Sequence, residues 1–336
     1  TTISIFDGTT LLGTTTADAL GNWTFTPTAA LTDGSHSLTA TATDATGSVS
    51  PATAAFTLTV DTAAPATPVI GTVTDDVAPV TGAITAGSST NDATPTLAGT
   101  AEANSTINVF DGTTLLGTTT SDASGSWTFT PTAALTDGSH SLTATATDAA
   151  GNVSPASSAF TLTVDTAAPA TPVIGSVTDD VAPVTGAITA GSSTNDATPT
   201  LTGTAEANST INVFDGTTLL GTTTADASGS WTFTPTAALT DGSHSLTATA
   251  TDAAGNVSPA SSAFTLTVDT AAPATPVIST VTDDVAPVTG AITTGSSTND
   301  ATPTLTGTAE ANSTVSIFDG TTLLGTTTAD ASGNWT

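Results

Sequence analysis

The chain has 336 residues, of which 29 are Asp or Glu and none is Lys or Arg, so its formal net charge is −29. Because no Lys or Arg can pair with phosphate, we expect no nucleic acid as a partner and no binding to anionic membrane surfaces. The sequence contains no Cys, which excludes disulfides and thiol chemistry, and no apolar segment long enough to insert directly into a membrane as a spanning helix.

A repeat of 104 residues organises the chain, as the spacing of four Trp residues shows: Trp23, Trp127, Trp231 and Trp335. We number the segments repeat 1 (1–61, the C-terminal part of a unit), repeat 2 (62–165), repeat 3 (166–269) and repeat 4 (270–336, the N-terminal part of a unit). Repeats 2 and 3 differ at only three positions: Thr72 against Ser176, Ala98 against Thr202, and Ser121 against Ala225. We expect a window from a longer array, and copies in series favour a spacer or a multivalent binder over an enzyme.

Within repeat 2, apolar and polar residues alternate with period two between Gly, Pro, Asp and Asn, which predicts short strands and no helix. In chain order, we predict strands at 69–74, 96–101, 106–110, 114–120, 126–130, 139–147 and 159–164. A long connection at 75–95 separates the first two strands. Seven strands in a unit of this size predict an all-β fold, a tandem of immunoglobulin-like β-sandwiches arranged as an elongated rod.

The alternation also assigns the faces of the strands. The side of strand 139–147 that carries His140 and Leu142 is expected to face the core, and its Thr residues are expected to face water. The other predicted core residues are Leu97, Ile107, Val109, Trp127, Phe129, Ala144, Ala146, Phe160, Leu162 and Val164. His140 is interpreted as hydrogen-bonding the corner that precedes its strand.

Acidic residues follow the strands that end where two repeats meet. Glu102 and Asp148 are expected at the N-terminal end of repeat 2, where Asp61 arrives from repeat 1. Two carboxylates about 4 Å apart repel by roughly 1 kcal/mol even in water, and no Lys or Arg is present to offset the repulsion. Oxygen ligands without Cys favour Ca²⁺. We therefore predict a calcium site at each junction, from Asp61, Glu102 and Asp148, then from Asp165, Glu206 and Asp252, then from Asp269 and Glu310.

A second acidic group lies in the long connection, at the opposite end of the repeat. A loop of about 20 residues is long for a compact domain, and a bound ion would hold it in one conformation. We predict a further calcium cluster here, from Asp75, Asp76 and Asp92, repeated as Asp179, Asp180 and Asp196 and as Asp283, Asp284 and Asp300. Neither an EF-hand nor a glycine-rich nonapeptide motif is present, so the prediction rests on topology and charge.

Other motifs are interpreted as ordinary structural features. Asp137, Ser139 and His140 are catalytic residue types, but neighbours at one strand entry cannot form a nucleophile, base and orienting group, so we expect no enzyme. Asp111 and Asp137, each followed by Gly, are interpreted as solvated turn residues. The sequon at Asn104 is interpreted as a turn. The exposed Thr residues could order water in an ice-binding face, but they suit exposed strand positions without that role.

Several ordered segments carry a resemblance to a known family: DTAAPATPVI, VTDDVAPVTG, ATPTLTGTAEANSTINVFDG, GSWTFTPTAALTDGSHSLTATATDAAGN and AFTLTVD. They resemble the bacterial immunoglobulin-like repeats of giant RTX-type, type I secreted surface adhesins, along the whole chain. The near-identical copies look most similar to the extender of an ice-binding adhesin, in which ice binding belongs to a separate domain. The resemblance implies calcium ligands at Asp61, Glu102 and Asp148 and at Asp75, Asp76 and Asp92.

The resemblance also implies a location on the outer surface of a Gram-negative bacterium, in biofilm or surface attachment. The function that we expect is a structural stalk whose junctions are stiffened by Ca²⁺ and which projects a distal ligand-binding domain of unknown target. Its partners are then the neighbouring repeats and calcium ions. The alternative is a multivalent module that binds a glycan or a protein. The loops contain essentially no aromatic residues, which disfavours that alternative.

Overall fold

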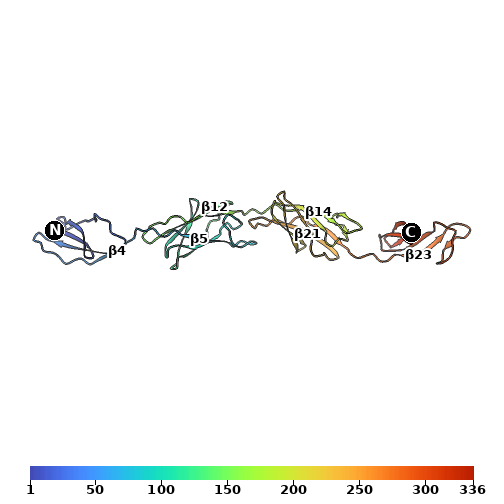
Figure 1. Ribbon diagram of the computed structural model, residues 1–336, viewed down its shortest axis with the longest axis horizontal. Helices are drawn as coiled ribbons and strands as arrows, with labels where there is room; N and C mark the ends of the chain where they lie inside the picture. The colour runs from blue at the N-terminus through green and yellow to red at the C-terminus, as the bar shows by residue number, and fades with distance from the viewer.

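The computed structural model describes residues 1–336 as strands, turns and loops without a helix. Figure 1 shows the chain as an elongated row of small bodies that follow one another from the N-terminus to the C-terminus. Each complete body is built from two β-sheets, so the predicted rod of tandem immunoglobulin-like sandwiches is confirmed. The structure holds no helix of the length and apolar character needed to cross a membrane.

Repeat 2 contains a four-stranded sheet in the order β11-β8-β5-β6 and a five-stranded sheet in the order β10-β9-β12-β13-β7. The strands of the first sheet are β5 (Val69–Asp75), β6 (Gly82–Ala83), β8 (Thr96–Thr100) and β11 (Ser126–Phe129). Those of the second are β7 (Ser89–Thr90), β9 (Thr106–Asp111), β10 (Thr114–Thr120), β12 (Gly138–Thr147) and β13 (Phe160–Val164). Neighbouring strands are antiparallel except β7 and β13, which are parallel.

Repeat 3 has the same topology, with sheets in the orders β15-β14-β17-β20 and β16-β22-β21-β18-β19. The first sheet contains β14 (Val173–Asp179), β15 (Gly186–Ala187), β17 (Thr200–Thr204) and β20 (Ser230–Phe233). The second contains β16 (Ser193–Thr194), β18 (Thr210–Asp215), β19 (Thr218–Thr224), β21 (Gly242–Thr251) and β22 (Phe264–Val268). The two complete repeats are therefore two copies of one structure.

The part-repeats keep the strands that their sequences contain. Repeat 1 is one sheet in the order β2-β1-β3-β4, with β1 (Thr2–Asp7), β2 (Thr10–Thr16), β3 (Gly34–Thr43) and β4 (Phe56–Val60). Repeat 4 has a sheet in the order β24-β23-β25-β28 and the hairpin β26-β27. Its strands are β23 (Val277–Asp283), β24 (Gly290–Ala291), β25 (Thr304–Thr308), β26 (Thr314–Asp319), β27 (Thr322–Thr328) and β28 (Asn334–Trp335).

All seven strands predicted for repeat 2 are present, each within one residue of its predicted ends. The connection at 75–95 is more ordered than predicted, because it contributes β6 to one sheet and β7 to the other. This segment therefore passes from the first sheet to the second before β8 begins. The crossing places its acidic residues beside the end of β13.

The core of repeat 2 lies between the two sheets. Val73, Leu97, Ile107 and Leu142 are fully buried and come from β5, β8, β9 and β12. Of the predicted core residues, only Phe160 is half-buried, and the others are buried. Each fully buried aliphatic side chain contributes about 1.5–3 kcal/mol of hydrophobic stabilisation, so this core can position the loops at both ends of the sandwich.

Candidate functional site at the junctions between repeats

The long loop of repeat 2 (residues 75–95) holds two buried carboxylates at one end of the sandwich. Asp75 ends β5 and is 6% exposed, whereas Asp92 is fully buried. The Thr90 hydroxyl joins them, since it donates to Asp75 Oδ2 at 2.5 Å and accepts from the Asp92 main-chain N–H at 3.1 Å. Asp76 is exposed, but its N–H donates to Asp92 Oδ2 at 3.3 Å. Three predicted site residues are thus brought into one compact unit.

The same unit recurs in the next two long loops. In repeat 3, the Thr194 hydroxyl donates to Asp179 at 2.5 Å and accepts from the N–H of Asp196 at 3.1 Å. In repeat 4, Thr298 joins Asp283 and Asp300 in the same way. The exposed third members are Asp180 and Asp284, whose N–H groups donate to the buried Asp196 and Asp300.

This buried unit lies at the junction with the following repeat. Thr90 in β7 pairs with Val164 at the end of β13, and the Thr90 carbonyl accepts from the Asp165 N–H at 3.0 Å. In repeat 3, the equivalent residues Asp179 and Asp269 line one open pocket of about 570 Å³. The sequence analysis treated the long-loop acids and the linker acids as separate sites. The structure places the long loop of one repeat and the linker acid that follows it at the same junction.

The other side of each junction is formed by the loop of the following repeat that corresponds to the β12–β13 loop. In repeat 2 this loop (residues 148–159) faces repeat 1, and in repeat 3 its equivalent (residues 252–263) faces repeat 2. Asp148 Oδ1 accepts hydrogen bonds from the main-chain N–H groups of Ala150, Gly151 and Asn152, at 2.8–2.9 Å. The Asn152 side chain, followed by these N–H groups, holds the pKa of the Asp148 carboxyl below its usual value. Asp148 therefore fixes the conformation of its loop.

An Asn side chain that the sequence analysis missed connects one repeat to the next. Asn152 Nδ2 donates to the carbonyl oxygen of Asp61 at 3.0 Å and to Asp148 Oδ2 at 2.9 Å. Asn256 makes the same two bonds, to the Asp165 carbonyl at 2.8 Å and to Asp252 at 2.9 Å. The only sequence signal for this contact was the position of Asn152 in a Gly-Asn turn, and Asn is common in such turns for reasons of local conformation alone.

The remaining linker acids are not gathered around one point. Glu102, Glu206 and Glu310 are exposed. Asp61, Asp165 and Asp269 each accept from the N–H two residues further along, at 3.1 Å. No group of three or more Asp, Glu or His side chains stands close enough together to hold a metal ion. The structure thus brings the acids of both repeats to the junction without assembling them into a coordination shell.

Asp137 is hydrogen-bonded to the linker that follows repeat 2. Its Oδ1 accepts from the main-chain N–H of Thr166 at 3.0 Å and from the hydroxyl of Thr166 at 2.9 Å. Asp33 and Asp241 make the same pair of bonds to Thr62 and Thr270. Asp137 is exposed in the corner before β12, as interpreted, and its carboxylate also ties this corner to the start of the next linker.

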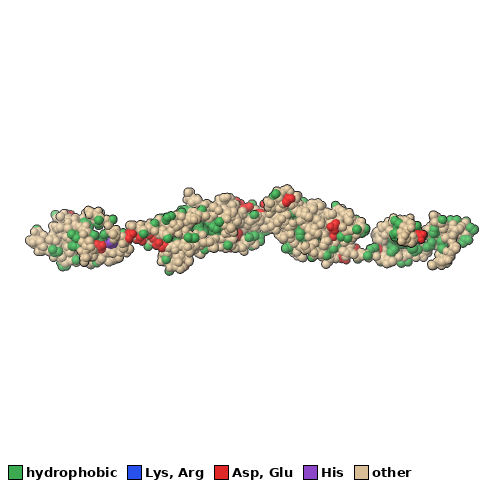
Figure 2. All heavy atoms as spheres, viewed as in Figure 1, with side chains coloured by type: hydrophobic (Ala, Val, Ile, Leu, Met, Phe, Trp, Pro, Cys, Tyr) green, Lys and Arg blue, Asp and Glu red, His purple; other side chains and the backbone are tan.

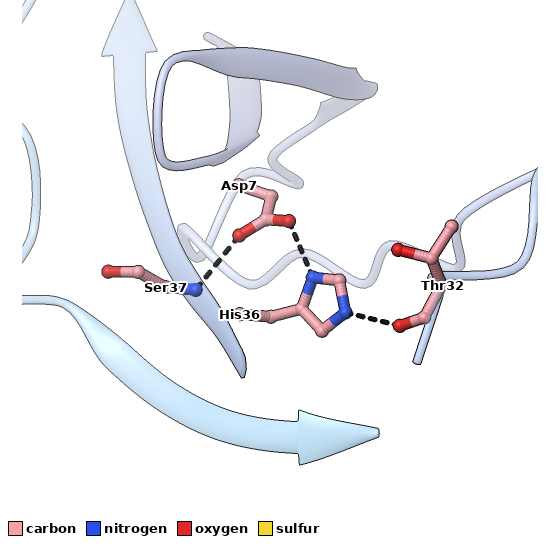
Figure 3. A network of polar contacts seen from close by, with 4 residues as sticks. All are labelled: Asp7, Thr32, His36 and Ser37. Carbon is pink, nitrogen blue, oxygen red and sulfur yellow. Dashed lines mark hydrogen bonds and ion pairs between the residues drawn. The ribbon is translucent and has the colours of Figure 1, made fainter. Parts of the chain in front are cut away.

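Each histidine lies between a carboxylate and a carbonyl group, as Figure 3 shows for His36. His36 Nδ1 lies 2.6 Å from Asp7 Oδ2, and His36 Nε2 lies 2.7 Å from the Thr32 carbonyl oxygen. Neither oxygen carries a proton when the carboxyl is ionised, so both ring nitrogens can donate at the same time only when the ring is the imidazolium cation. The bond to Asp7, then the bond to Thr32, raises the pKa of His36. Ser37 completes the network by donating its N–H to Asp7 Oδ1 at 2.8 Å.

The complete repeats contain the same pair. His140 lies 2.7 Å from Asp111 Oδ2 and 2.7 Å from the Thr136 carbonyl oxygen. Burial lowers the pKa of His140, but its bonds to Asp111 and Thr136 raise the pKa by more, so it lies above its ordinary value. The predicted bond to the corner before β12 is confirmed. The interpretation of Asp111 as a solvated turn residue was wrong, because Asp111 is the counter-ion of a buried histidine.

Many of the acidic side chains lie where the bodies meet, and others lie on the bodies themselves (Figure 2). Figure 2 shows red carboxylate side chains at the narrow places between neighbouring bodies and no blue side chain anywhere on the visible face. The chain has no Lys or Arg, so the three histidines are its only cationic side chains. Each is already paired inside its own repeat, and the junction acids have no cationic side chain as a partner.

A family model described as a bacterial Ig-like domain matches residues 1–62, 67–166 and 171–270. The chain belongs to this family. No curated protein sequence matches these Ig-like repeats.

Solved structures with tandem domains are also similar to this chain. A tetra-tandem repeat from the extending region of a large adhesion protein is 25% identical, covers 99% of this chain and 81% of its own, and has a TM-score of 0.29. Fibronectin(III)-like modules of CbhA from Clostridium thermocellum are 18% identical over 59% of this chain and 94% of theirs, with a TM-score of 0.35. The BSP domain of a biofilm-associated protein is 20% identical over 71% and 43%, with a TM-score of 0.22. At these scores, none of the similarities carries an argument about function.

Proposed function

We propose that these Ig-like repeats form a structural extender in the stalk of a bacterial cell-surface adhesin and hold a distal ligand-binding domain away from the cell. The observation that carries the proposal is that repeats 2 and 3, which differ at three positions, fold as separate sandwiches placed end to end. Each copy adds length without adding a new kind of surface. Both ring nitrogens of each histidine lie within hydrogen-bond distance of a carboxylate or a carbonyl oxygen, so none is free to act as a general base.

The proposal includes an extracellular location on a Gram-negative bacterium, with anchoring at the outer membrane after type I secretion. These points follow the resemblance of the quoted segments to RTX-type adhesins. The ligand of the distal domain, whether ice or another surface, lies outside the proposal. A stalk needs junctions that resist bending, so the chemistry of the junctions is the part of the proposal that this chain can test.

We further propose that Ca²⁺ offsets the acids at each junction. At the junction of repeats 2 and 3 the available metal ligands are oxygen atoms, which suit Ca²⁺. Asp75 and Asp92 are buried without a cation, and burying an unpaired carboxylate costs several kcal/mol. Asn91 Oδ1 is also buried and has no hydrogen-bond partner, which leaves an oxygen atom beside them available as a metal ligand. The proposed ligand set is Asp75, Asn91, Asp92, Asp165, Glu206 and Asp252.

Residues from both repeats would have to move closer together for this set to act as one site. That requirement would couple ion binding to stiffness, because the long loop of one repeat and the loops of the next would be held by the same contacts. Bound at the junction, Ca²⁺ would supply the positive charge that the chain lacks. At a concentration 100 times its Kd, a ligand of the folded state adds about 2.7 kcal/mol of stability per site.

The test compares the 336-residue chain in CaCl₂ and in EDTA. We expect Ca²⁺ to raise the Tm and to narrow further the spread of maximum dimensions measured by small-angle X-ray scattering. Extracellular modules bind Ca²⁺ with a Kd of about 10⁻⁴–10⁻³ M, so the titration should span the millimolar range. An unchanged Tm and an unchanged scattering profile would reject the calcium proposal.

Two variants locate the effect. Asp165→Asn removes one carboxylate from the junction of repeats 2 and 3 and is expected to reduce the rise in Tm. Asp18→Asn removes the same charge from an exposed turn of repeat 1, where Asp18 accepts from the N–H groups of Leu20 and Asn22. We expect Asp18→Asn to respond to Ca²⁺ like the unmodified chain. Equal responses of the two variants would place the ion elsewhere.

A further inference from the structure

Repeats 2 and 3 are joined by direct contacts between protein atoms, in addition to the covalent linker. None of these contacts involves an ion. We infer that the long loop of each repeat is a receptor for the β12–β13 type of loop in the repeat that follows, so that consecutive repeats interlock through protein contacts. The occupant is therefore a second copy of the same module. The inference goes beyond the proposed function, since it needs neither an adhesin role nor a bound ion.

Three contacts form the interlock, and they come from different segments of repeat 2. The Asn91 N–H donates to the Ala254 carbonyl at 3.0 Å. The Val80 side chain packs over Gly255, where a Cβ atom would lie 3.2 Å from Val80 Cγ2. From the linker, the Asp165 carbonyl accepts from Asn256 at 2.8 Å. Contacts from positions 80, 91 and 165 to three successive residues hold one loop from several sides.

The two complete repeats provide an internal comparison, because residues 148–159 and 252–263 have the same sequence. In repeat 3, Ala254 is 3% exposed and Gly255 is buried. In repeat 2, the equivalent Ala150 and Gly151 are exposed, and no atom lies within 4 Å of a Cβ placed on Gly151. Repeat 1 contains no long loop in this chain, so the difference in burial measures the contribution of the preceding repeat.

The receptor side shows the complementary difference. Val80 is 56% exposed beside repeat 3, whereas the equivalent Val184 is 73% exposed. Repeat 4 ends in this chain at Thr336, before the loop that would contact Val184. Here Pro183, Val184 and Asn195 line the open pocket of about 570 Å³ together with the linker that begins at Asp269. The surface that receives a loop on repeat 2 is therefore an open concavity on repeat 3.

The inserted loop is also ordered before it docks. Asp252 Oδ1 accepts from the N–H groups of Ala254, Gly255 and Asn256 at 2.8–2.9 Å, and Asp148 makes the same bonds in the undocked copy. A loop that is already fixed loses little conformational entropy on docking. The contact can therefore stabilise one orientation of neighbouring repeats although it is small.

The experiment uses matched glycine variants. Gly255 and Gly151 have φ values of 100° and 96°, so a side chain meets the same backbone strain at both positions, but only Gly255 faces Val80. Gly255→Leu should block docking, whereas Gly151→Leu should extend into solvent. Thr118→Cys and Thr222→Cys, at exposed equivalent positions of repeats 2 and 3, provide two label sites in a chain with no other Cys.

The distance distribution between spin labels at positions 118 and 222 is measured by pulsed electron paramagnetic resonance in EDTA. We expect a narrow distribution for the parent chain and for Gly151→Leu, and the loss of the narrow peak in Gly255→Leu. Equal Tm values of the two Leu variants would show that strain on the loop is matched. The inference is overturned if the parent chain is already broad in EDTA, or if Gly255→Leu stays as narrow as Gly151→Leu. Neither result depends on whether Ca²⁺ raises the Tm.

Discussion

At the scale of single residues, the three histidines are the only side chains that can carry positive charge in a molecule of net charge −29. Each is fixed by two acceptors, one of which is a carboxylate on a neighbouring strand. The ion pair joins β9 to β12 in repeat 2, and the second bond joins the corner that precedes β12. The stability of each sandwich should therefore depend on the protonation of one ring.

The direction of this pH dependence follows from the raised pKa of His140 and His244. The stabilisation is fully present below the ordinary histidine pKa of 6.5 and is lost as the pH rises through the higher pKa of the folded state. We expect the Tm to fall as the pH rises above about 6.5, through the raised pKa of the folded state, in a range where the carboxylates stay ionised. The variant with His36→Gln, His140→Gln and His244→Gln should have a lower Tm at pH 6 and a flatter profile. An equally steep profile in that variant would show that another group titrates.

Asp111, the partner of His140, limits the stabilisation by this ion pair at low pH. The bonds from His140 and from the Ser141 N–H lower the pKa of Asp111 by more than burial raises it. The contribution of Asp111 is therefore present above its ordinary pKa of 3.8 and is lost as the pH falls through the lower pKa of the folded state. The ion pair stabilises the fold in the range between the two pKa values.

At the scale of elements, the long loop is the part of the repeat that connects the two sheets and reaches the next repeat. Its strand β7 pairs with β13. Thr90 is one of the two residues of β7, and its hydroxyl lies between Asp75 and Asp92. The hydroxyl of Thr90 is thus a structural link between two buried carboxylates. Such a link is needed because no cationic side chain approaches them.

Replacing Thr90 and its equivalent Thr194 by Val tests this link, because Val keeps the shape and removes the hydroxyl. Leaving a buried acceptor unsatisfied costs about 1–3 kcal/mol, so we expect each complete repeat to be destabilised by about that amount. Urea unfolding of the chain measures the change. The control replaces the exposed Thr114 and Thr218 by Val and should change stability by no more than about 0.5 kcal/mol. Similar midpoints for the two variants would contradict the proposed role of Thr90.

The strands could be predicted from the sequence because alternation has the same period as the pleat, and short turns with Gly and Asn mark their ends. β7 could not be predicted, because a two-residue strand made of Ser89 and Thr90 has no period to detect. Its pairing with β13 depends on the path of the whole long loop. That path is set by the two sheets that the loop connects.

The candidate site was predictable in part for a related reason. Topology placed acids at both ends of each repeat, and the structure does bring Asp75, Asp92 and Asp165 to one junction. Asp111 was misinterpreted because Asp-Gly is typical of turns, whereas its partner His140 is 29 residues away in the sequence. The contacts of Asn91 and Asn256 depend on how two repeats are oriented, and a repeat period carries no information on orientation.

At the scale of the whole molecule, a row of acidic bodies without basic residues repels itself most strongly where two bodies meet. Repulsion between like charges at a junction favours open arrangements, whereas the interlock and the linker bonds favour one closed arrangement. Both NaCl and Ca²⁺ would reduce the repulsion, but by different mechanisms. Dissolved salt screens all charges, whereas a bound ion acts only where ligands converge.

Salt and calcium can be separated by ionic strength. The Debye length falls from about 30 Å at 0.01 M to about 3 Å at 1 M, so NaCl should raise the Tm of the metal-free chain gradually over that range. A few millimolar CaCl₂ changes the ionic strength little, and we expect it to raise the Tm well beyond NaCl at equal ionic strength. MgCl₂ should have a smaller effect, because Mg²⁺ demands octahedral geometry and dehydrates reluctantly. If the three salts gave the same Tm at equal ionic strength, the junction acids would act only as diffuse charge, and stiffness would have to come from the protein contacts alone.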